Sequence, residues 1–107
     1  MLSKSNLYID PVKLKEYLLN MDHIDGRSKA KLLISFGFSS TDIDKLHQAI
    51  LGHVNNTDVK LLQTTFGDKF IVEGDMVTPV GKSLKIRSVW IKEKQEEIIK
   101  FVTLYPI

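Results

Sequence analysis

Three cationic side chains lie within five positions of the sequence, at Arg27, Lys29 and Lys31. The surrounding pattern predicts that a helix begins there, and a helix N-terminus already carries partial positive charge and free backbone amides. Cations at such a place are disfavoured unless an anion such as a phosphate group binds nearby. The cluster therefore favours phosphate binding, and the alternative is that these side chains are solvated on a helix whose other side packs.

A histidine precedes this cluster. His23 lies in a polar segment, residues 22–26, that ends in glycine and predicts a tight connection between two helices. Because an imidazole exchanges its proton near neutral pH, His23 is a candidate general acid or base for phosphodiester cleavage, and the alternative is a solvated turn residue. His47 and His53 are six positions apart and do not share a helical face, so no metal site is expected.

A second set of cations belongs to a strand expected over residues 83–91. Lys85 and Arg87 fall on one side of this strand, and apolar side chains fall on the other side. Lys100 is expected opposite them on the next strand. The resulting basic face could bind a nucleic-acid backbone, whereas the alternative is the solvated face of an antiparallel sheet.

Ser88 is a hydroxyl that interrupts the apolar side of the same strand, between Ile86 and Trp90. Thr103 and Tyr105 are expected in phase with it on the following strand. Buried hydroxyls need hydrogen-bond partners, so these groups either satisfy one another or line a cleft and position a substrate phosphate.

The composition limits the functional classes. The chain has 107 residues, 43% of them hydrophobic, and a formal net charge of +2, which predicts a single domain over residues 1–107 with an ordered core of about residues 9–106. It has no cysteine, so thiolate metal sites and cysteine nucleophiles are excluded. There is no apolar run of about 18 residues, so no membrane association is expected. We expect a cytoplasmic location, in the producing cell or after delivery into another cell.

Periodicity predicts the elements that must position these residues. Helices are expected over about residues 11–20, from residue 27 or so to Gly37, and over about residues 41–52, with strands over residues 70–73, 83–91 and 98–105. Residues 53–65 fit a short helix or an edge strand. We therefore predict an α+β fold of about three N-terminal helices packed on a C-terminal antiparallel β-meander of three to four strands.

The sequence also resembles a family of small bacterial domains that are associated with polymorphic toxin and immunity loci. The landmarks, over about residues 9–106, are Asp10-Pro11, Lys13-Leu14, Tyr17-Leu18-Leu19, His23, Gly26, Lys29-Ala30, Phe36-Gly37-Phe38, Phe66-Gly67, residues 69–74, Ser88, Val89-Trp90, Val102-Thr103 and Tyr105-Pro106. The order of helices and then strands is similar to the barnase, EndoU, colicin and RelE-like ribonuclease architecture.

This resemblance implies a metal-independent endoribonuclease domain of a toxin-like module that needs no cofactor. In that reading His23 is the general acid or base, Lys29 and Arg87 stabilise the phosphorane, and Ser88 and Tyr105 orient the phosphate. Its partners would be RNA and a cognate small immunity or antitoxin protein. The alternative is a non-catalytic protein-binding module that is itself immunity-like, antitoxin-like or an adaptor.

Overall fold

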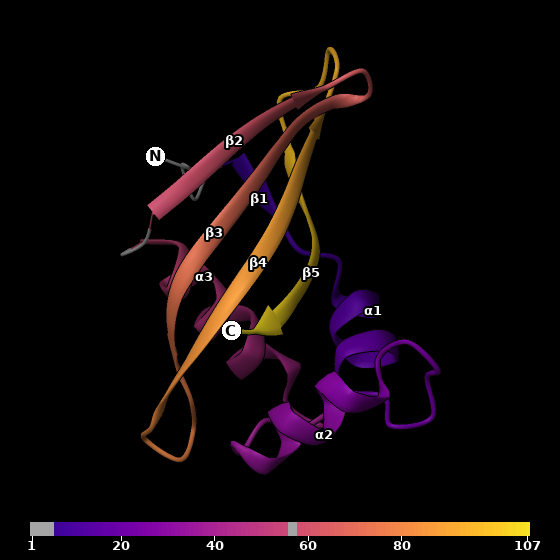
Figure 1. Cartoon of the computed structure of the whole chain (residues 1–107). Coiled ribbons are helices and arrows are strands. Elements are labelled where there is room, and N and C mark those ends of the chain that lie inside the picture. The colour runs from indigo at the N-terminus through magenta and orange to yellow at the C-terminus, as the bar shows by residue number, and fades with distance from the viewer. Residues whose placement is uncertain (1–5, 56–57) are drawn as a thin grey trace.

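The computed structural model describes residues 6–55 and 58–107, which form an α+β fold with a five-stranded mixed sheet. The elements in chain order are β1 (Leu7–Tyr8), α1 (Pro11–Lys13), the π-helical segment η2 (Leu14–Leu18), α2 (Arg27–Ser35), α3 (Ile43–Asn55), β2 (Asp58–Thr64), β3 (Gly67–Val77), β4 (Ser83–Glu93) and β5 (Ile99–Pro106). The strand order across the sheet is β1-β5-β4-β3-β2 (Figure 1).

The expected meander of three to four strands is therefore wrong. Strands β2 to β5 pair antiparallel in succession, and β1 adds a fifth strand that runs parallel to β5, with Leu7 opposite Ile99. A two-residue strand carries no periodic signal in the sequence, so only the tertiary pairing shows it. The ambiguous residues 53–65 divide between the end of α3 and β2, and residues 56–57 lie outside the described residues.

The first predicted helix is shorter and less regular than expected. Asp10 caps α1, because its carboxylate accepts the backbone N–H of Val12 at 3.0 Å. The chain then continues as a π-helical segment that ends at Leu18. The second helix, α2, ends before Gly37, whose φ of 99° fits the left-handed cap that the sequence predicts there.

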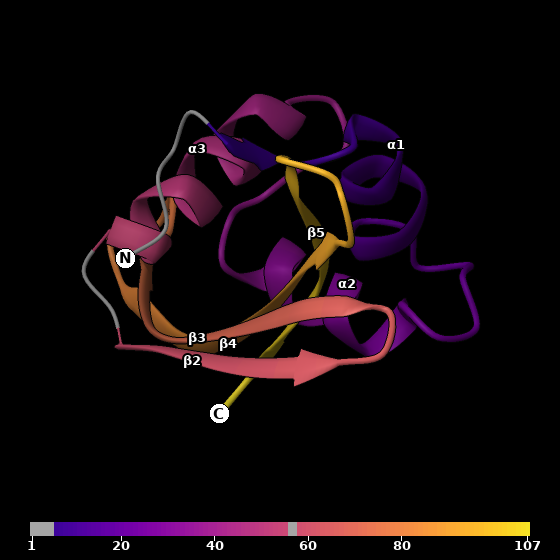
Figure 2. The same ribbon diagram turned by 90° about the horizontal axis from the view of Figure 1, so that it is seen from above.

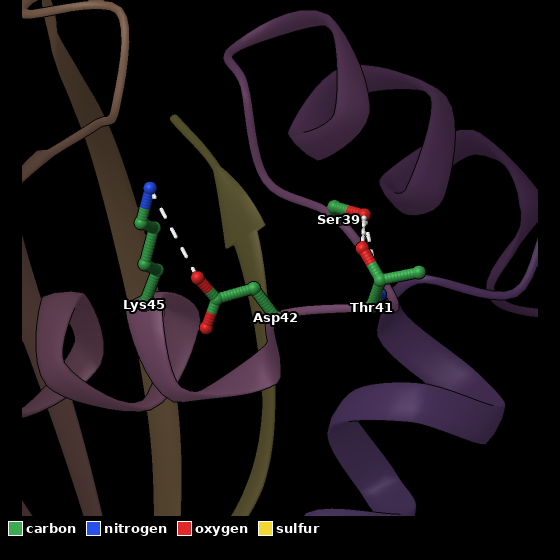
Figure 3. Close-up of polar contacts among 4 residues, drawn as sticks. All are labelled: Ser39, Thr41, Asp42 and Lys45. Carbon is green, nitrogen blue, oxygen red and sulfur yellow. Dashed lines mark hydrogen bonds and ion pairs between the residues drawn. The ribbon is translucent and has the colours of Figure 1, made fainter.

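The third helix begins two residues later than the sequence suggests, at Ile43. The loop before it is held by hydroxyls: the Ser39 Oγ lies 2.8 Å from the Thr41 Oγ1 and accepts the Thr41 backbone N–H at 3.1 Å (Figure 3). Lys45 approaches Asp42 at 3.9 Å across the first turn. These contacts fix the direction in which α3 leaves the loop and crosses β3.

The helices cover one face of the sheet, as the two views of the ribbon show (Figures 1 and 2). The sheet contributes Val72, Met76, Ile86, Trp90 and Leu104 to the core, and the helical layer contributes Leu14, Leu18, Leu33, Leu46 and Ile50. The Trp90 ring meets the Phe101 ring edge to face, with centroids 5.2 Å apart. Because side chains alternate along a strand, Arg87 and Val89 of β4 face away from this core. No helix in the described part of the chain spans this second face.

One polar chain crosses the core. The Trp90 indole N–H donates to the Ser88 hydroxyl at 2.9 Å, and that hydroxyl lies 2.9 Å from Nε2 of His53. His53 Nδ1 lies 3.2 Å from the Gly74 carbonyl oxygen, which only accepts. The imidazole therefore carries its proton on Nδ1, and Nε2 accepts from Ser88. Each buried group in this series of hydrogen bonds has a partner only while His53 is neutral.

Among the described residues, no helix has the length and apolar character required to span a bilayer.

We expect acid to destabilise this fold through His53. Burial lowers the pKa of His53, and this outweighs the hydrogen bonds to the Gly74 region that raise it. A lowered folded-state pKa means that the unfolded chain binds the proton more readily, so the contribution to stability is complete above about pH 6.5 and is lost as the pH falls below that value. Urea unfolding at pH 7.5 and 5.5 measures this loss.

The His47→Gln protein is the matched control, because His47 lies on the same helix but is partly exposed. It should lose as much stability on acidification as the parent, whereas His53→Gln should lose less. Equal losses in the parent and in His53→Gln would show that another group controls the acid sensitivity.

Candidate functional site

A tyrosine from the helical layer connects a lysine to the sheet. The Lys29 ammonium donates to the Tyr17 hydroxyl at 2.5 Å, and this hydroxyl lies 3.2 Å from the Thr103 Oγ1. The same ammonium is 5.0 Å from the centre of the Tyr17 ring. These residues come from η2, α2 and β5, and we call them the tyrosine cluster.

The surroundings of Tyr17 change its acidity. Burial raises the pKa of Tyr17, but the hydrogen bonds from Lys29 and Thr103 and the positive charge of Lys29 outweigh burial, and the pKa is lowered from its usual value. All three side chains are partly exposed. The Tyr17 side chain is thus accessible in part, and the deprotonated form of its hydroxyl is stabilised by a neighbouring cation.

His23 supports this tyrosine. Its Nδ1 accepts the backbone N–H groups of Asp25 and Gly26, each at 3.1 Å, and its ring lies edge to face with the Tyr17 ring at 5.0 Å. Because Nδ1 is occupied as an acceptor, the neutral ring carries its proton on Nε2. The histidine that the sequence suggests as an acid or base thus closes the turn before α2 and positions the Tyr17 ring.

A second polar group lies on the helix-free face of the sheet. Arg87 is paired with Glu73 across β3 and β4 and approaches the Tyr105 hydroxyl at 3.4 Å. Its guanidinium lies 5.6 Å from the centre of the Tyr105 ring. The Tyr105 and Glu73 hydrogen bonds raise the pKa of Arg87, so it stays charged. We call these three residues the arginine cluster.

The arginine cluster borders a hollow of about 390 Å³ that is also lined by Lys60 and Ile71. In the sheet register Arg87 is opposite both Glu73 and Tyr105, so strands β3, β4 and β5 each contribute one member. The hollow is thus a surface site on the sheet whose wall carries Arg87 and Lys60 together with the carboxylates of Asp58 and Glu73.

Strand β5 contributes one residue to each cluster. Thr103 is opposite Val89 and Tyr105 is opposite Arg87, so both β5 side chains project from the same face of the sheet, two residues apart. Tyr17 can reach Thr103 because β1 pairs only with residues 99 and 100 of β5. The rest of that β5 edge borders the helical segment, where Lys13 donates to the Phe101 carbonyl at 3.4 Å.

The structure separates Ser88 from this site. Ser88 is opposite Leu104 in the register and is fully buried, so the expectation that it is in phase with Thr103 and Tyr105 is wrong. The offset between neighbouring strands depends on a register shift near Val89 and Trp90, which strand periodicity does not reveal. Its hydroxyl belongs to the polar chain in the core.

The other predicted cations are spread over the surface. Arg27 and Lys31 are exposed on α2, while Lys100 pairs with Glu96 at 3.6 Å and with Glu93 at 3.9 Å. They do not join Lys29 in an anion site at the helix end. Instead, Lys29 alone turns toward the sheet.

The sequence did not indicate Tyr17 as a site residue, and it indicated Thr103 only as one of several hydroxyls near Ser88. Tyr17 falls on the apolar stripe of the first helix and is therefore expected in the core. The hydroxyl of Tyr17 could have indicated a polar site, because a half-buried phenol needs a hydrogen-bond partner. Within residues 6–55 and 58–107 no group of three or more His, Asp or Glu side chains could hold a metal ion.

The comparisons with known proteins identify the family. Residues 2–107 match the model of a domain of unknown function, DUF6883, and the chain belongs to this family. No curated protein matches it.

The fold is similar to a chain from a solved structure described as a contact-dependent growth inhibition toxin and immunity protein complex from Klebsiella pneumoniae 342. The TM-score is 0.66 at 19% identity, over 92% of this chain and 98% of the other. At this identity, the likeness concerns the fold.

We expect a methyl group at Gly26 to displace α2 from Tyr17. A Cβ there would lie 2.2 Å from the Tyr17 carbonyl oxygen and 3.0 Å from its ring Cδ1. The Gly26→Ala protein should lose about 1–3 kcal/mol of unfolding free energy, measured by urea denaturation.

Gly52→Ala is the control, since a Cβ at Gly52 on α3 meets nothing within 4 Å. This change should stabilise the protein by about 0.5–1 kcal/mol. If Gly26→Ala is as harmless as Gly52→Ala, then the close approach of Gly26 to Tyr17 is not a constraint on the fold.

Proposed function

We propose that this chain is a metal-independent RNA-cleaving domain of a toxin that is paired with an immunity protein. The observation that carries the proposal is the Lys29, Tyr17 and Thr103 hydrogen-bond chain. Its Thr103 projects from the same face of β5 as Tyr105, which contacts Arg87. This arrangement offers a proton acceptor from η2, one cation from α2, one cation from β4, and two neutral hydroxyls two residues apart on β5.

These groups match what RNA cleavage by the neighbouring ribose hydroxyl requires. The 2′-oxygen attacks phosphorus, its proton passes to the Tyr17 oxygen, and the bond from phosphorus to the 5′-oxygen breaks. Lys29 and Arg87 stabilise the negative charge of the phosphorane, and Tyr105 orients the phosphate. The Lys29 ammonium supplies the proton to the 5′-oxygen. The products are a 2′,3′-cyclic phosphate and a free 5′-hydroxyl.

Two observations support the roles that we assign to the remaining residues. The lowered pKa of Tyr17, which follows from Lys29 and Thr103 opposing the effect of burial, increases the phenolate fraction near neutral pH. We assign His23 the role of a positioning residue, because its Nδ1 holds the turn before α2 and its ring packs against the Tyr17 ring. We leave Ser88 out of the site because it is buried and hydrogen-bonded in the core.

The structural neighbour supports the cellular setting. It is described as a complex of a growth inhibition toxin with its immunity protein. A chain of similar fold with a surface site for phosphate chemistry fits the toxin member of such a pair. It would act on RNA in the cytoplasm of the cell that receives it.

The decisive test is incubation of the purified protein with total RNA in excess chelator. The parent should cleave RNA and leave cyclic phosphate ends, whereas Tyr17→Phe and Arg87→Ala should each lower the rate by about 100-fold or more. Lys31→Ala and Lys85→Ala are controls, because they remove exposed cations from the same helix and the same strand. Both should cleave as the parent does.

The dependence of the rate on pH provides an independent check. The cleavage rate should rise with pH and level off below pH 10, the usual pKa of a tyrosine, because Tyr17 acts in its deprotonated form. The Lys29→Ala protein, if it retains activity, should level off at higher pH. Intact RNA with a correctly folded parent protein would refute the proposal.

A second candidate function is protein binding without catalysis. Strand β2 ends the sheet, and no strand in the described parts of the chain pairs with its outer edge. Near this edge Leu61 is 50% exposed, Leu62 is 44% exposed and Phe66 is 81% exposed, so a partner could add a strand or cover this apolar surface.

Cell growth separates the two candidates. Production of a toxin domain should arrest growth, and Tyr17→Phe should restore it, since this change removes one hydroxyl. Production of a protein-binding module should leave growth unchanged in both forms.

A further inference from the structure

A pocket of about 650 Å³ opens beside the tyrosine cluster. The rings of Tyr17 and His23 and the side chains of Val12 and Val102 supply its apolar surface, and Glu16 lies at its border. Thr103 lines the same pocket, so the pocket adjoins the hydroxyl to which the proposed chemistry is assigned. A nucleotide with its phosphate at Tyr17 and Lys29 would place its base here.

The pocket has the surface that a flat aromatic ring requires. Val12 is 62% exposed although it is apolar, and the Tyr17 and His23 rings, which pack edge to face, line one part of the pocket. Stacking and apolar contacts of this kind bind bases in single-stranded RNA. A base would cover apolar surface that is now exposed to water.

The polar border of the pocket favours hydrogen-bond donors. In the part of the chain that the structure describes, the Glu16 carboxylate makes no hydrogen bond or ion pair. Asp10 is occupied in part as the cap of α1, and Lys13 is directed to the Phe101 carbonyl. A free acceptor at the edge of an apolar pocket suits an amino group of a base and repels a phosphate.

We infer that this pocket is a base-binding subsite, and that it selects bases with an exocyclic amino group over uracil through Glu16. Adenine, cytosine and guanine each present an N–H₂ group with two donor hydrogens, whereas uracil presents a single N3–H donor flanked by two carbonyl oxygens that a carboxylate disfavours. The place of the subsite next to the cleaved bond rests on the proposed function, but the pocket and its selectivity do not.

The first experiment maps cleavage on single-stranded RNAs that differ only in the base next to the cleaved bond. The parent should disfavour uracil by about tenfold, as one good base contact allows. In Glu16→Gln the new amide can also donate to a uracil oxygen, so discrimination should fall to about twofold or less. Glu97→Gln makes the same change of charge at an exposed loop residue and should keep the parental preference.

The second experiment measures binding without catalysis. Adenosine, cytidine, guanosine and uridine are titrated into the protein, and the methyl signals of Val12 and Val102 are followed by NMR. Adenosine, cytidine and guanosine should shift these signals at lower concentrations than uridine. In Glu16→Gln the concentrations required for the four nucleosides should be closer to one another.

The outcomes distinguish the two proposals. Shifts with the expected selectivity but intact RNA would retain the subsite and reject the nuclease. Cleavage with no base preference, together with no selective shifts, would reject the subsite and retain the nuclease. Equal shifts for all four nucleosides would overturn the role of Glu16.

Discussion

The close contact between Gly26 and the backbone of Tyr17 determines how the helical layer meets the sheet. With no Cβ at Gly26, the turn that His23 closes can pass directly over the Tyr17 carbonyl. Helix α2 then starts at a position from which Lys29 reaches the Tyr17 hydroxyl, and this hydroxyl reaches Thr103 on β5. A larger residue at the turn would move Lys29 and the tyrosine apart. The candidate site thus depends on a backbone contact that contributes no chemistry of its own.

The protein uses its hydroxyls and rings in two electrostatic settings. In the core, Ser88 and His53 are buried and pass hydrogen bonds in one direction, from Trp90 toward the Gly74 carbonyl, so neutrality of the imidazole is a condition of stability. At the surface, the Tyr17 hydroxyl is only partly buried and faces a cation, which favours its charged form. Similar groups therefore serve structure in one place and are suited to chemistry in the other, because burial and the sign of the neighbouring charge differ.

Strand β5 connects these settings. One side of the strand contributes Phe101 and Leu104 to the core, while Thr103 and Tyr105 project from the other side and each belongs to one of the two polar clusters. The short β1 leaves the rest of this β5 edge to the helices, and this allows a helical tyrosine to join a strand threonine. A fully paired β5 would have kept the helical layer away from that side chain. Val102 and Thr103, from the part of β5 that β1 does not pair, also line the pocket beside Tyr17, so the proposed chemistry and the proposed base selectivity share the same segment of β5.

The sequence by itself determined the local features of this protein: the α+β order of helices and strands, the cap at Asp10, the left-handed Gly37 and the side of β4 on which Arg87 lies. Each of these follows from side-chain chemistry or from alternation within a few residues. Only the tertiary structure decided the parallel β1, the register that separates Ser88 from Tyr105, and the contact between Lys29 and Tyr17. These features join segments that are distant in sequence, and a shift of one residue in strand pairing reverses the face on which a side chain lies. Short-range periodicity contains no information about such offsets, so the sequence indicates some of the candidate residues, whereas their arrangement depends on the tertiary structure.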